Sequence, residues 1–299
     1  MLSPLEHNRL LTTECLREYR NRRVLFFPNP GNAGDSLICL GTMHLLDRLG
    51  VRWEPVGAQG NVQGQTVLIG GGGNLVPLYR DTRVAMERFA TAAARLIVLP
   101  HTIRGNEDLL RSLGPTATVF CRDVESYAHV LRNTAPGVEV VLAHDMAFHV
   151  EADRFLRSHP QADRFRARFA ERLGEAGVDL ASDAVRRRAR FGRGDEESAG
   201  HVANPHLDVS AVFAFGTWPH AAELSAWCLL EALRIVESVE TDRLHVAIGC
   251  ALLGRECTLH DNSYGKNRVV YDHSLRRFPS VTFADKTRAQ QGAGPGSAG

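Results

Sequence analysis

The chain lacks an excess of charge of either sign. Its 299 residues include 35 Lys and Arg against 34 Asp and Glu, which gives a formal net charge of +1 at pH 7. Nucleic-acid-binding domains usually carry a basic field, so we expect no nucleic-acid partner, and any anion site must be local. Lysine is also scarce and occurs only at Lys266 and Lys286. Because arginine is the default cation here, its abundance alone does not indicate phosphate binding.

The sequence also lacks paired cysteines and long apolar segments. No CxxC pair occurs, which favours reduced core thiols over a disulfide framework or a zinc site, and we expect neither a metal nor a resident cofactor. No apolar run approaches the roughly 20 residues of a membrane span, and the first residues contain acids and arginines where a signal peptide needs apolar ones. We therefore expect a cytoplasmic protein. The six cysteines are Cys15, Cys39, Cys121, Cys228, Cys250 and Cys257.

Short apolar runs alternate with amphipathic segments over residues 1–150, a pattern that predicts a parallel sheet covered by helices. Asp35 is expected to cap the first of these helices, and Pro100 is expected to end the third strand. We interpret this region as one doubly wound, Rossmann-like domain. The predicted strands are residues 23–27, 66–69, 96–99, 118–121 and 139–142, and the predicted helices are 36–49, 81–95 and 125–132.

The composition changes after residue 150. Residues 151–186 are rich in arginine, alanine and acids, which predicts a charged helical connector, and residues 187–285 then resume the α/β pattern of a second, smaller Rossmann-like domain. Residues 286–299 contain no large apolar side chain and are expected to be disordered. In the second domain the predicted strands are residues 189–191, 209–215, 234–236 and 256–260, and the predicted helices are 220–233 and 242–253.

Loops at the carboxyl ends of parallel strands form the ligand crevice in such folds, so polar residues after each strand are candidates for a site. In the first loop, residues 31–35, glycines allow close approach of a ligand and the following helix offers free amides. A tight turn would explain Gly34 and Asp35 but not Asn32. The second loop has four glycines, including Gly72 and Gly73, before Asn74. Such a run favours ligand contact over a plain connection.

Two further loops contain cations. Arg122 follows a strand and precedes an acidic helix start, where a solvated ion pair is the ordinary interpretation. Arg243 could bind a carboxylate or phosphate through two hydrogen bonds, and His245 can transfer a proton near neutral pH. The alternative is that Asp242 and Arg243 simply begin a helix while His245 packs. A second polar loop, with Asn262 and Lys266, follows the next strand and favours a shared crevice.

The order and spacing of these segments resemble the polysaccharide pyruvyl transferase family. The resemblance runs through GNAGDSLI (31–38), VLIGGGGNL (67–75), RDVES (122–126), FGRGDEE (191–197), TDRLHVAIGCALLG (241–254) and DNSYGKN (261–267), and covers roughly residues 23–285. It implies two Rossmann-like domains facing a cleft, similar to GT-B glycosyltransferases. It also implies transfer of the enolpyruvyl group of phosphoenolpyruvate to two hydroxyls of a sugar, as a ketal.

The resemblance also implies roles for individual residues. Arg243, Leu244 and His245 fall on the family's RLH segment, with Arg243 binding the donor and His245 acting as general acid or base. Arg122, Asn262 and Lys266 would help to bind phosphoenolpyruvate. The residues expected to form acceptor or loop contacts are Asn32, Asp35, Gly72, Gly73, Asn74, His101, Arg193 and Glu197.

The expected partners are therefore phosphoenolpyruvate and a sugar of an exopolysaccharide or cell-surface glycan precursor. A lipid-linked acceptor would bring the protein to the inner membrane face, although no amphipathic helix predicts attachment. The chain departs from many relatives at His101, where they have glutamine, so substrate selection is expected to differ there.

Three other functions fit parts of the sequence. A GDSL-type esterase would use Ser36 as nucleophile, His245 as base and Asp242 to orient it. A GT-B nucleotide-sugar glycosyltransferase would keep the fold and bind a nucleotide diphosphate. A sugar-binding module would keep the fold without chemistry.

Overall fold

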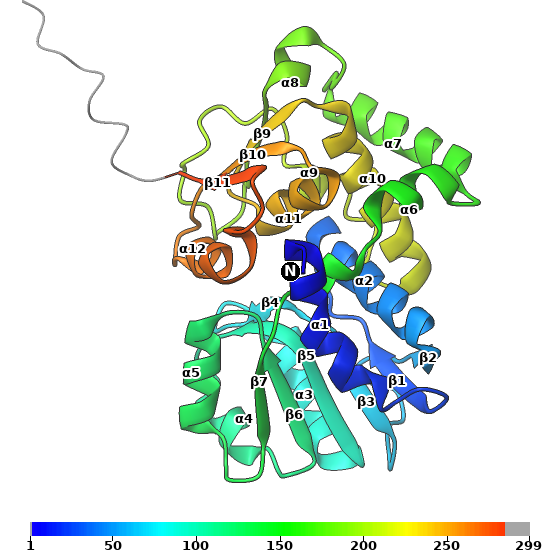
Figure 1. Cartoon of the computed structure of the whole chain (residues 1–299), viewed down its shortest axis with the longest axis vertical. Coiled ribbons are helices and arrows are strands. Elements are labelled where there is room, and N and C mark those ends of the chain that lie inside the picture. The colour runs from blue at the N-terminus through cyan, green and yellow to red at the C-terminus, as the bar shows by residue number, and fades with distance from the viewer. Residues whose placement is uncertain (1, 285–299) are drawn as a thin grey trace, which may run out of the picture.

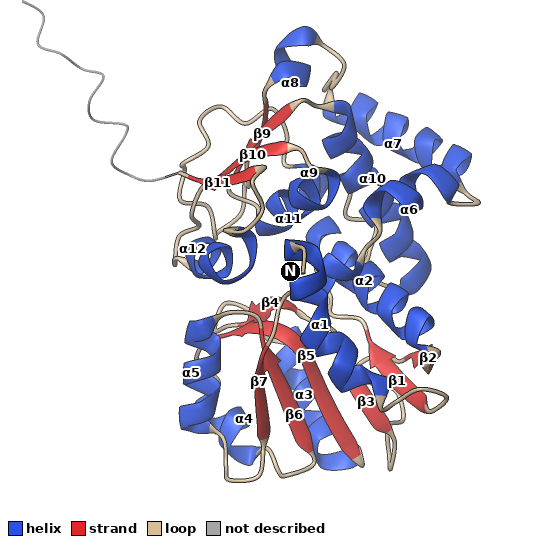
Figure 2. Cartoon of the chain, in the orientation of Figure 1, coloured by secondary structure: helices blue, strands red, loops and turns tan. Residues whose placement is uncertain are grey.

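The computed structural model describes residues 2–284 and contains two parallel β-sheets with helices packed around them (Figures 1 and 2). The α/β class with parallel sheets is thus confirmed. The first sheet is formed by β1 (Arg23–Phe27), β2 (Arg52–Pro55), β3 (Thr66–Ile69), β4 (Gly72–Leu75), β5 (Arg95–Ile103), β6 (Ala117–Cys121) and β7 (Glu139–Leu142). The second sheet is formed by β8 (Ala189–Phe191), β9 (Ser238–Thr241), β10 (Glu256–Leu259) and β11 (Val281–Phe283).

The first sheet has the strand order β2-β1-β3-β5-β6-β7, with β4 beside β5. The chain builds from β1 to one edge, crosses back, and then builds from β3 to the other edge. The reversal between β1 and β3 is the switch point of a doubly wound sheet, where successive loops diverge and leave a crevice. All strands predicted in this half are present, and β2 and β4 are additional.

Helices cover both faces of the first sheet. On one face, Phe26 of β1 joins the buried cluster formed with α1 (Pro4–Arg17) and α2 (Ala33–Leu49). On the other face, the next residue, Phe27, packs edge-on against Phe89. Alternate residues of a strand therefore feed two separate cores. The second layer contains α3 (Asp81–Ala92), α4 (Glu107–Ser112) and α5 (Val124–Asn133).

Strand β5 continues through Pro100, where it was predicted to end. The pairing of β5 with β6 shifts register between Val98 and His101, and this irregularity accommodates a residue that has no N–H to donate. His101 and Thr102 are consequently buried strand residues. The loop expected at this position does not form.

The second sheet is simpler than the doubly wound arrangement predicted for it. Its order, β11-β10-β9-β8, follows the chain without a reversal. Buried and partly exposed residues alternate along β9 and β10. The buried face packs against α10 (Pro219–Ile235) and α11 (Leu244–Leu253).

Two strands predicted in this half are wrong. Residues 209–215 begin with the short helix α9 (Val209–Val212), and their buried residues Val209 and Phe213 are four positions apart, as on a helix face. Residues 234–236 contain the end of α10, and the strand begins only at Ser238.

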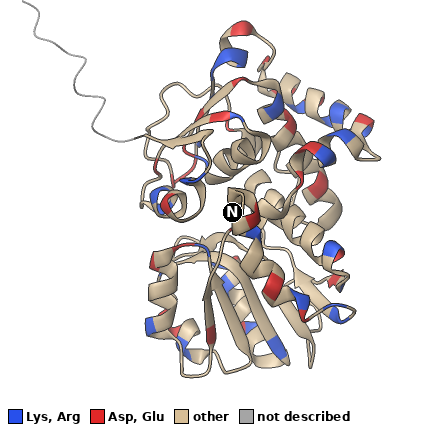
Figure 3. Ribbon diagram, viewed as in Figure 1, with Lys and Arg blue, Asp and Glu red and all other residues tan. Residues whose placement is uncertain are grey.

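The segment predicted as a charged connector is helical. Arginines and acids alternate along its helices (Figure 3). On the longest of them, Arg168 pairs with Glu171 at 2.5 Å and Arg172 with Glu175 at 2.8 Å, so much of the charge is compensated locally. The helices are α6 (Ala152–Ser158), α7 (Ala162–Ala176) and α8 (Asp183–Arg187), of which α6 and α7 contact α10.

Helix α2 joins the two sheets. It packs along α10, so one hydrophobic cluster extends from Phe26 through Leu37 and Leu230 to Leu259 of the second sheet. Gly41 permits a close approach to the short helix η1 (Met146–His149), because a Cβ there would lie 2.0 Å from the Met146 carbonyl oxygen. The amino end of α2 is thereby fixed between both halves.

All six cysteines are free, and five of them are buried, as expected for reduced core thiols. Within residues 2–284, no helix combines the length and the hydrophobicity that crossing a bilayer requires. The tail predicted to be disordered, residues 286–299, lies outside the described residues.

Candidate active site

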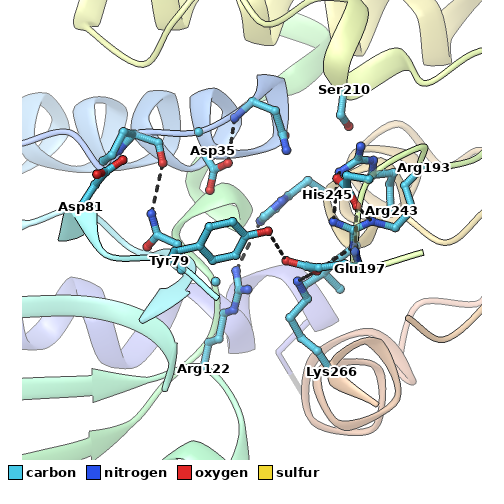
Figure 4. Close-up of a pocket in the computed structure, with 17 residues that line it drawn as sticks. Asp35, Tyr79, Asp81, Arg122, Arg193, Glu197, Ser210, Arg243, His245 and Lys266 are labelled. Atoms are coloured by element: carbon cyan, nitrogen blue, oxygen red, sulfur yellow. Dashed lines mark hydrogen bonds and ion pairs between the residues drawn. The ribbon is translucent and has the colours of Figure 1, made fainter. Parts of the chain in front are cut away.

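A cavity of about 230 Å³ lies between the two sheets and is lined by loops that follow strands of both (Figure 4). The first half contributes Pro30, Gly31, Asn32, Asp35, Gly73, Asn74, Tyr79, Asp81 and Arg122. The second half contributes Arg193, Asp195, Glu197, Ser210, Arg243, Leu244, His245 and Lys266. Residues of both glycine loops and of the Arg243 segment therefore line one cavity.

The amino end of α2 forms one wall. Asn32, and not Asp35, is the N-cap: its side-chain oxygen accepts from the Gly34 amide at 2.8 Å, and the Asp35 carboxylate accepts from the Asn32 amide at 2.9 Å. This reciprocal cap explains Asn32, which a simple turn had left unexplained. Burial raises the pKa of Asp35, and the nearby His245 opposes that rise.

Glycines make room for the functional side chains. A Cβ at Gly34 would lie 2.6 Å from Nδ1 of His245, and a Cβ at Gly31 would lie 1.9 Å from Oδ2 of Asp35. The four-glycine loop is similar, because a Cβ at Gly73 would lie 2.7 Å from a terminal nitrogen of Arg122. Gly72 instead faces the Asn29 side chain and does not line the cavity.

Arg122 is held from behind by buried groups. Its Nε donates to the Thr102 hydroxyl at 2.9 Å, and its Nη1 donates to Oδ2 of Asp145 at 2.7 Å. The Arg122 and Asp145 side chains are 1% and 0% exposed, so this ion pair is shielded from water. The remaining terminal nitrogen lies beside Gly73, where it can reach a ligand.

The same carboxylate oxygen also serves His245. Oδ2 of Asp145 lies 3.4 Å from Nε2 of His245, while Oδ1 accepts from the Ala147 amide at 2.8 Å. Burial alone would raise the pKa of Asp145, but His245 and Arg122 hold it well below its usual range. The Asp145 carboxylate is thus shared between Arg122 and His245.

Two arginines from the second half lie side by side in the opposite wall (Figure 4). Arg193 pairs with Glu197 at 2.7 Å and with Asp195 through two contacts of 2.7 and 3.1 Å. Arg243 binds Asp208 through Nε, at 3.1 Å, and through Nη2, and its Nη1 lies 2.9 Å from Asp195. Each arginine is therefore neutralised within the protein.

Lys266, the first residue of α12 (Lys266–Val270), extends into the cavity beside these arginines. Its ammonium donates to Oε2 of Glu197 at 2.7 Å, and Asn262 donates to the same oxygen at 3.2 Å. Burial lowers the pKa of Lys266 to about 8, despite the opposing effect of Glu197. Burial would raise the pKa of Glu197, but Lys266 and Arg193 lower it to about 2.

Tyr79 connects the two walls at this point. Its hydroxyl donates to Oε1 of Glu197 at 2.9 Å, so a side chain that follows β4 binds one that follows β8 (Figure 4). Burial, followed by the Glu197 charge, raises the pKa of Tyr79. Glu197 is thus the acceptor shared by Tyr79, Arg193, Asn262 and Lys266.

The sequence matches the family model described as "Polysaccharide pyruvyl transferase" over residues 32–264. The chain belongs to the polysaccharide pyruvyl transferase family. It is 27% identical over 289 residues to "Putative pyruvyl transferase EpsO" of Bacillus subtilis (strain 168), a match that covers 85% of each chain. It also resembles a crystal structure of the functionally uncharacterized protein KP1_0663 from Klebsiella pneumoniae subsp. pneumoniae NTUH-K2044. That match has a TM-score of 0.74 and 28% identity, and covers 93% of this chain and 98% of the other.

In this pyruvyl transferase family member, three residues expected at the site lie behind the cavity surface. Asn262 positions Glu197, as described above, and Gly72 contacts Asn29. His101 is fully buried, with its pKa lowered to about 3 by burial, and its Nε2 lies 3.0 Å from Oδ1 of Asn74. Its effect on substrate selection would therefore act through Asn74.

Sequence reasoning missed several carboxylates of the site and two hydroxyls, those of Tyr79 and Ser210. Asp145 follows β7 by three positions, so the rule that pointed to the other strand ends would also have found it. Asp195 lies inside the FGRGDEE segment but was not singled out. Asp208 was missed because residues 209–215 were taken for a strand. Asp208 would then precede the amino end of that strand, whereas candidates were sought after the carboxyl ends of strands. Tyr79 follows β4, a strand that the glycine run concealed.

The esterase triad is not assembled. The Ser36 hydroxyl donates to the Asn32 and Gly216 carbonyl oxygens, at 3.2 and 3.0 Å, and the serine is fully buried. Asp242 accepts from the Arg193 amide at 2.9 Å, while the carboxylate beside His245 is Asp145. These contacts and the family membership argue against the esterase interpretation.

Proposed function

We propose that the protein transfers the enolpyruvyl group of phosphoenolpyruvate to a sugar of an exopolysaccharide or cell-surface glycan precursor, forming a pyruvate ketal. Family membership and the likeness to a protein named as a pyruvyl transferase support this proposal. We also propose that the two sheets correspond to the two lobes of a GT-B arrangement, with the cavity as the cleft between them.

The observation that carries the proposal is the placement of His245. It lies between two carboxylates, Asp35 and Asp145, in a cavity that also contains Arg122 and Lys266. Phosphoenolpyruvate has a carboxylate and a phosphate, so its site needs several fixed donors, together with one group that can deliver a proton.

The proposed reaction begins with proton transfer from His245 to the methylene carbon of the donor. The first sugar hydroxyl then bonds to the central carbon and loses its proton, which Asp35 can accept because its carboxylate lines the cavity and burial raises the pKa of that carboxylate. The second hydroxyl bonds to the same carbon as the C–O bond to phosphate breaks. One hydroxyl proton replaces the proton that His245 gave to carbon, and the other leaves with inorganic phosphate.

The direct test is to incubate the protein with phosphoenolpyruvate and a panel of lipid-linked or nitrophenyl sugars, following phosphate release and product mass. A product heavier than the acceptor by one pyruvate ketal is expected. A nucleotide-sugar panel provides the matched arm for the glycosyltransferase alternative. Transfer of a sugar, or no transfer from phosphoenolpyruvate to any acceptor, would contradict the proposal.

Two variants test the division of roles at the site. We expect His245→Gln to lower kcat by roughly 10²–10⁴ with little change in donor affinity, because it removes the proton carrier. Arg243→Ala should mainly weaken donor binding, because it removes a charge clamp. Unchanged kinetics in both variants, in steady-state assays of phosphate release, would refute the assignment of both residues.

A further inference from the structure

Arg193 and Arg243 share an arrangement that goes beyond ordinary ion pairing. Their side chains are only 6% and 7% exposed, and each has an inner carboxylate of its own. Glu197 forms an ion pair with Arg193, and Asp208 forms an ion pair with Arg243. Both of these carboxylates are much less exposed than that of Asp195, which pairs with both arginines.

Asp195 contacts both arginines. Its carboxylate forms a two-contact fork with Arg193, at 2.7 and 3.1 Å, and lies 2.9 Å from Nη1 of Arg243. Its side chain is 41% exposed and lines the cavity, so water and ligands reach it more readily than the two arginines, which also line the cavity but are largely covered.

The side chain of Asp195 has room to move, although its turn is anchored. The preceding residue, Gly194, is exposed, and a Cβ built there would meet no atom within 4 Å. The Gly194 amide donates to Oδ2 of Asp208 at 3.2 Å, and Glu197 is buried, so the backbone is held on both sides of Asp195. Rotation of the Asp195 side chain, with loss of its hydrogen bond from the Glu197 amide, would uncover the Arg193 fork and one nitrogen of Arg243.

We propose that Arg193 and Arg243 form the subsite for the carboxylate of the donor, and that Asp195 occupies this subsite in the free protein as a built-in substitute for that carboxylate. This rests on the proposed function, since it assigns one end of phosphoenolpyruvate to one place in the cavity. A planar carboxylate on paired guanidinium groups is the geometry that a bound donor would require, and Asp195 already shows it.

Two consequences follow from this arrangement. The donor must displace Asp195 before it binds, so Asp195 lowers donor affinity. In return, the two arginines never face each other without an intervening negative charge, which keeps the empty cavity from being destabilised by like-charge repulsion.

The experiment is equilibrium binding of three ligands by isothermal titration calorimetry: phosphoenolpyruvate, pyruvate, which has only the carboxylate, and inorganic phosphate. Asp195→Asn removes the charge but keeps the oxygen that caps the turn. We expect this variant to bind phosphoenolpyruvate and pyruvate roughly tenfold more tightly, equivalent to about 1.4 kcal/mol, and inorganic phosphate within about twofold of wild type.

The matched control is Glu196→Gln, which removes the neighbouring carboxylate of the same turn, outside the cavity lining. It should change binding of all three ligands by less than about twofold, because Glu196 is exposed and its charge is screened by solvent. Asp195→Ser provides a second variant: serine can still accept from the Glu197 amide but is too short to bridge both guanidinium groups.

Three results would overturn the inference. They are unchanged or weaker pyruvate binding in both Asp195 variants, equal tightening by Glu196→Gln, and tightening for phosphate but not for pyruvate. Because pyruvate binding needs no sugar and no turnover, failure of the proposed reaction and failure of this subsite would be seen separately.

Discussion

The two walls of the cavity hold their charges in different ways. In the first wall, Arg122 is fixed by fully buried partners, and glycine lets one of its nitrogens meet the cavity. In the second wall, Arg193 and Arg243 are almost completely matched by carboxylates, one of which is half exposed. The charges of the first wall are fixed by the fold. In the second wall, a ligand carboxylate could replace the Asp195 carboxylate on the two arginines.

His245 belongs to the second half of the chain by sequence but to the first wall by contact. It follows β9, yet its neighbours are Gly34, Asp35 and Asp145. A cavity with one rigid and one exchangeable wall suits a reaction in which proton transfer needs fixed geometry and a multiply charged donor must enter. Substitutions in the two walls should therefore produce different kinds of defect.

The largest effect is expected from Asp145→Asn in the rigid wall. It keeps the oxygen that accepts from Ala147 but removes the charge shared by Arg122 and His245, so kcat should fall by roughly 10². Steady-state assays of phosphate release measure this change.

Asp123→Asn is the matched control for that variant. Asp123 is equally buried and contacts Thr102, which also holds Arg122, but among the described residues it makes no hydrogen bond or ion pair with His245. This variant should lower stability while leaving the kcat of the folded protein nearly unchanged. If the two variants lower kcat equally, Asp145 acts only through folding.

An intermediate effect is expected at Lys266 in the exchangeable wall. Its pKa is lowered to about 8, so its positive charge is present below that pH and is lost as the pH rises through it. Donor binding by the wild type should therefore weaken by roughly tenfold between pH 7 and about 9.5, measured by calorimetry. Lys266→Arg should remove this dependence because arginine stays charged, and Lys266→Met should bind weakly at every pH. If donor binding by the wild type, Lys266→Arg and Lys266→Met changed with pH in the same way, Lys266 could not be the source of the pH dependence.

The smallest effect is expected where the walls touch. Tyr79→Phe removes the hydrogen bond to Glu197 but leaves that carboxylate with three other donors, so kcat/KM should fall by only about two- to threefold. Tyr264→Phe is the control, because its buried hydroxyl has no hydrogen-bond partner among the described residues. A loss of tenfold or more in Tyr79→Phe would mean that contact between the walls is essential for turnover.

The sequence was most informative at strand ends. Buried apolar runs placed every predicted strand of the first sheet, and the polar residues that follow them line the cavity. It was least informative where one signal concealed another: the glycine run concealed β4, and the apolar pattern at 209–215 concealed a helical turn. Strand β9 was placed too early because its alternating pattern, Ser238 to Thr241, is short and half polar.

Ion pairing could not be predicted in the same way. Arg243 lines the cavity, but nothing in the sequence shows that its three guanidinium nitrogens already have carboxylate partners. Such pairing depends on loops that come together from positions 35 or more residues away, and no local pattern encodes those contacts. The sequence shows which side chains carry a charge, but it does not show whether that charge is already paired within the protein or is free to bind a ligand.

The packing of helix α2 makes each half of the chain depend on the other for folding. This helix lies near the beginning of the chain, yet its flank is covered by α10, which is made much later. A fragment that ends near residue 150 would expose the apolar flank of α2 to water. The remaining fragment would lack the helix that packs against α10 and the capped amino end of α2 that lies beside His245. The first half should therefore remain a partly folded, aggregation-prone intermediate until the second half is synthesised. The cavity would be among the last features to form.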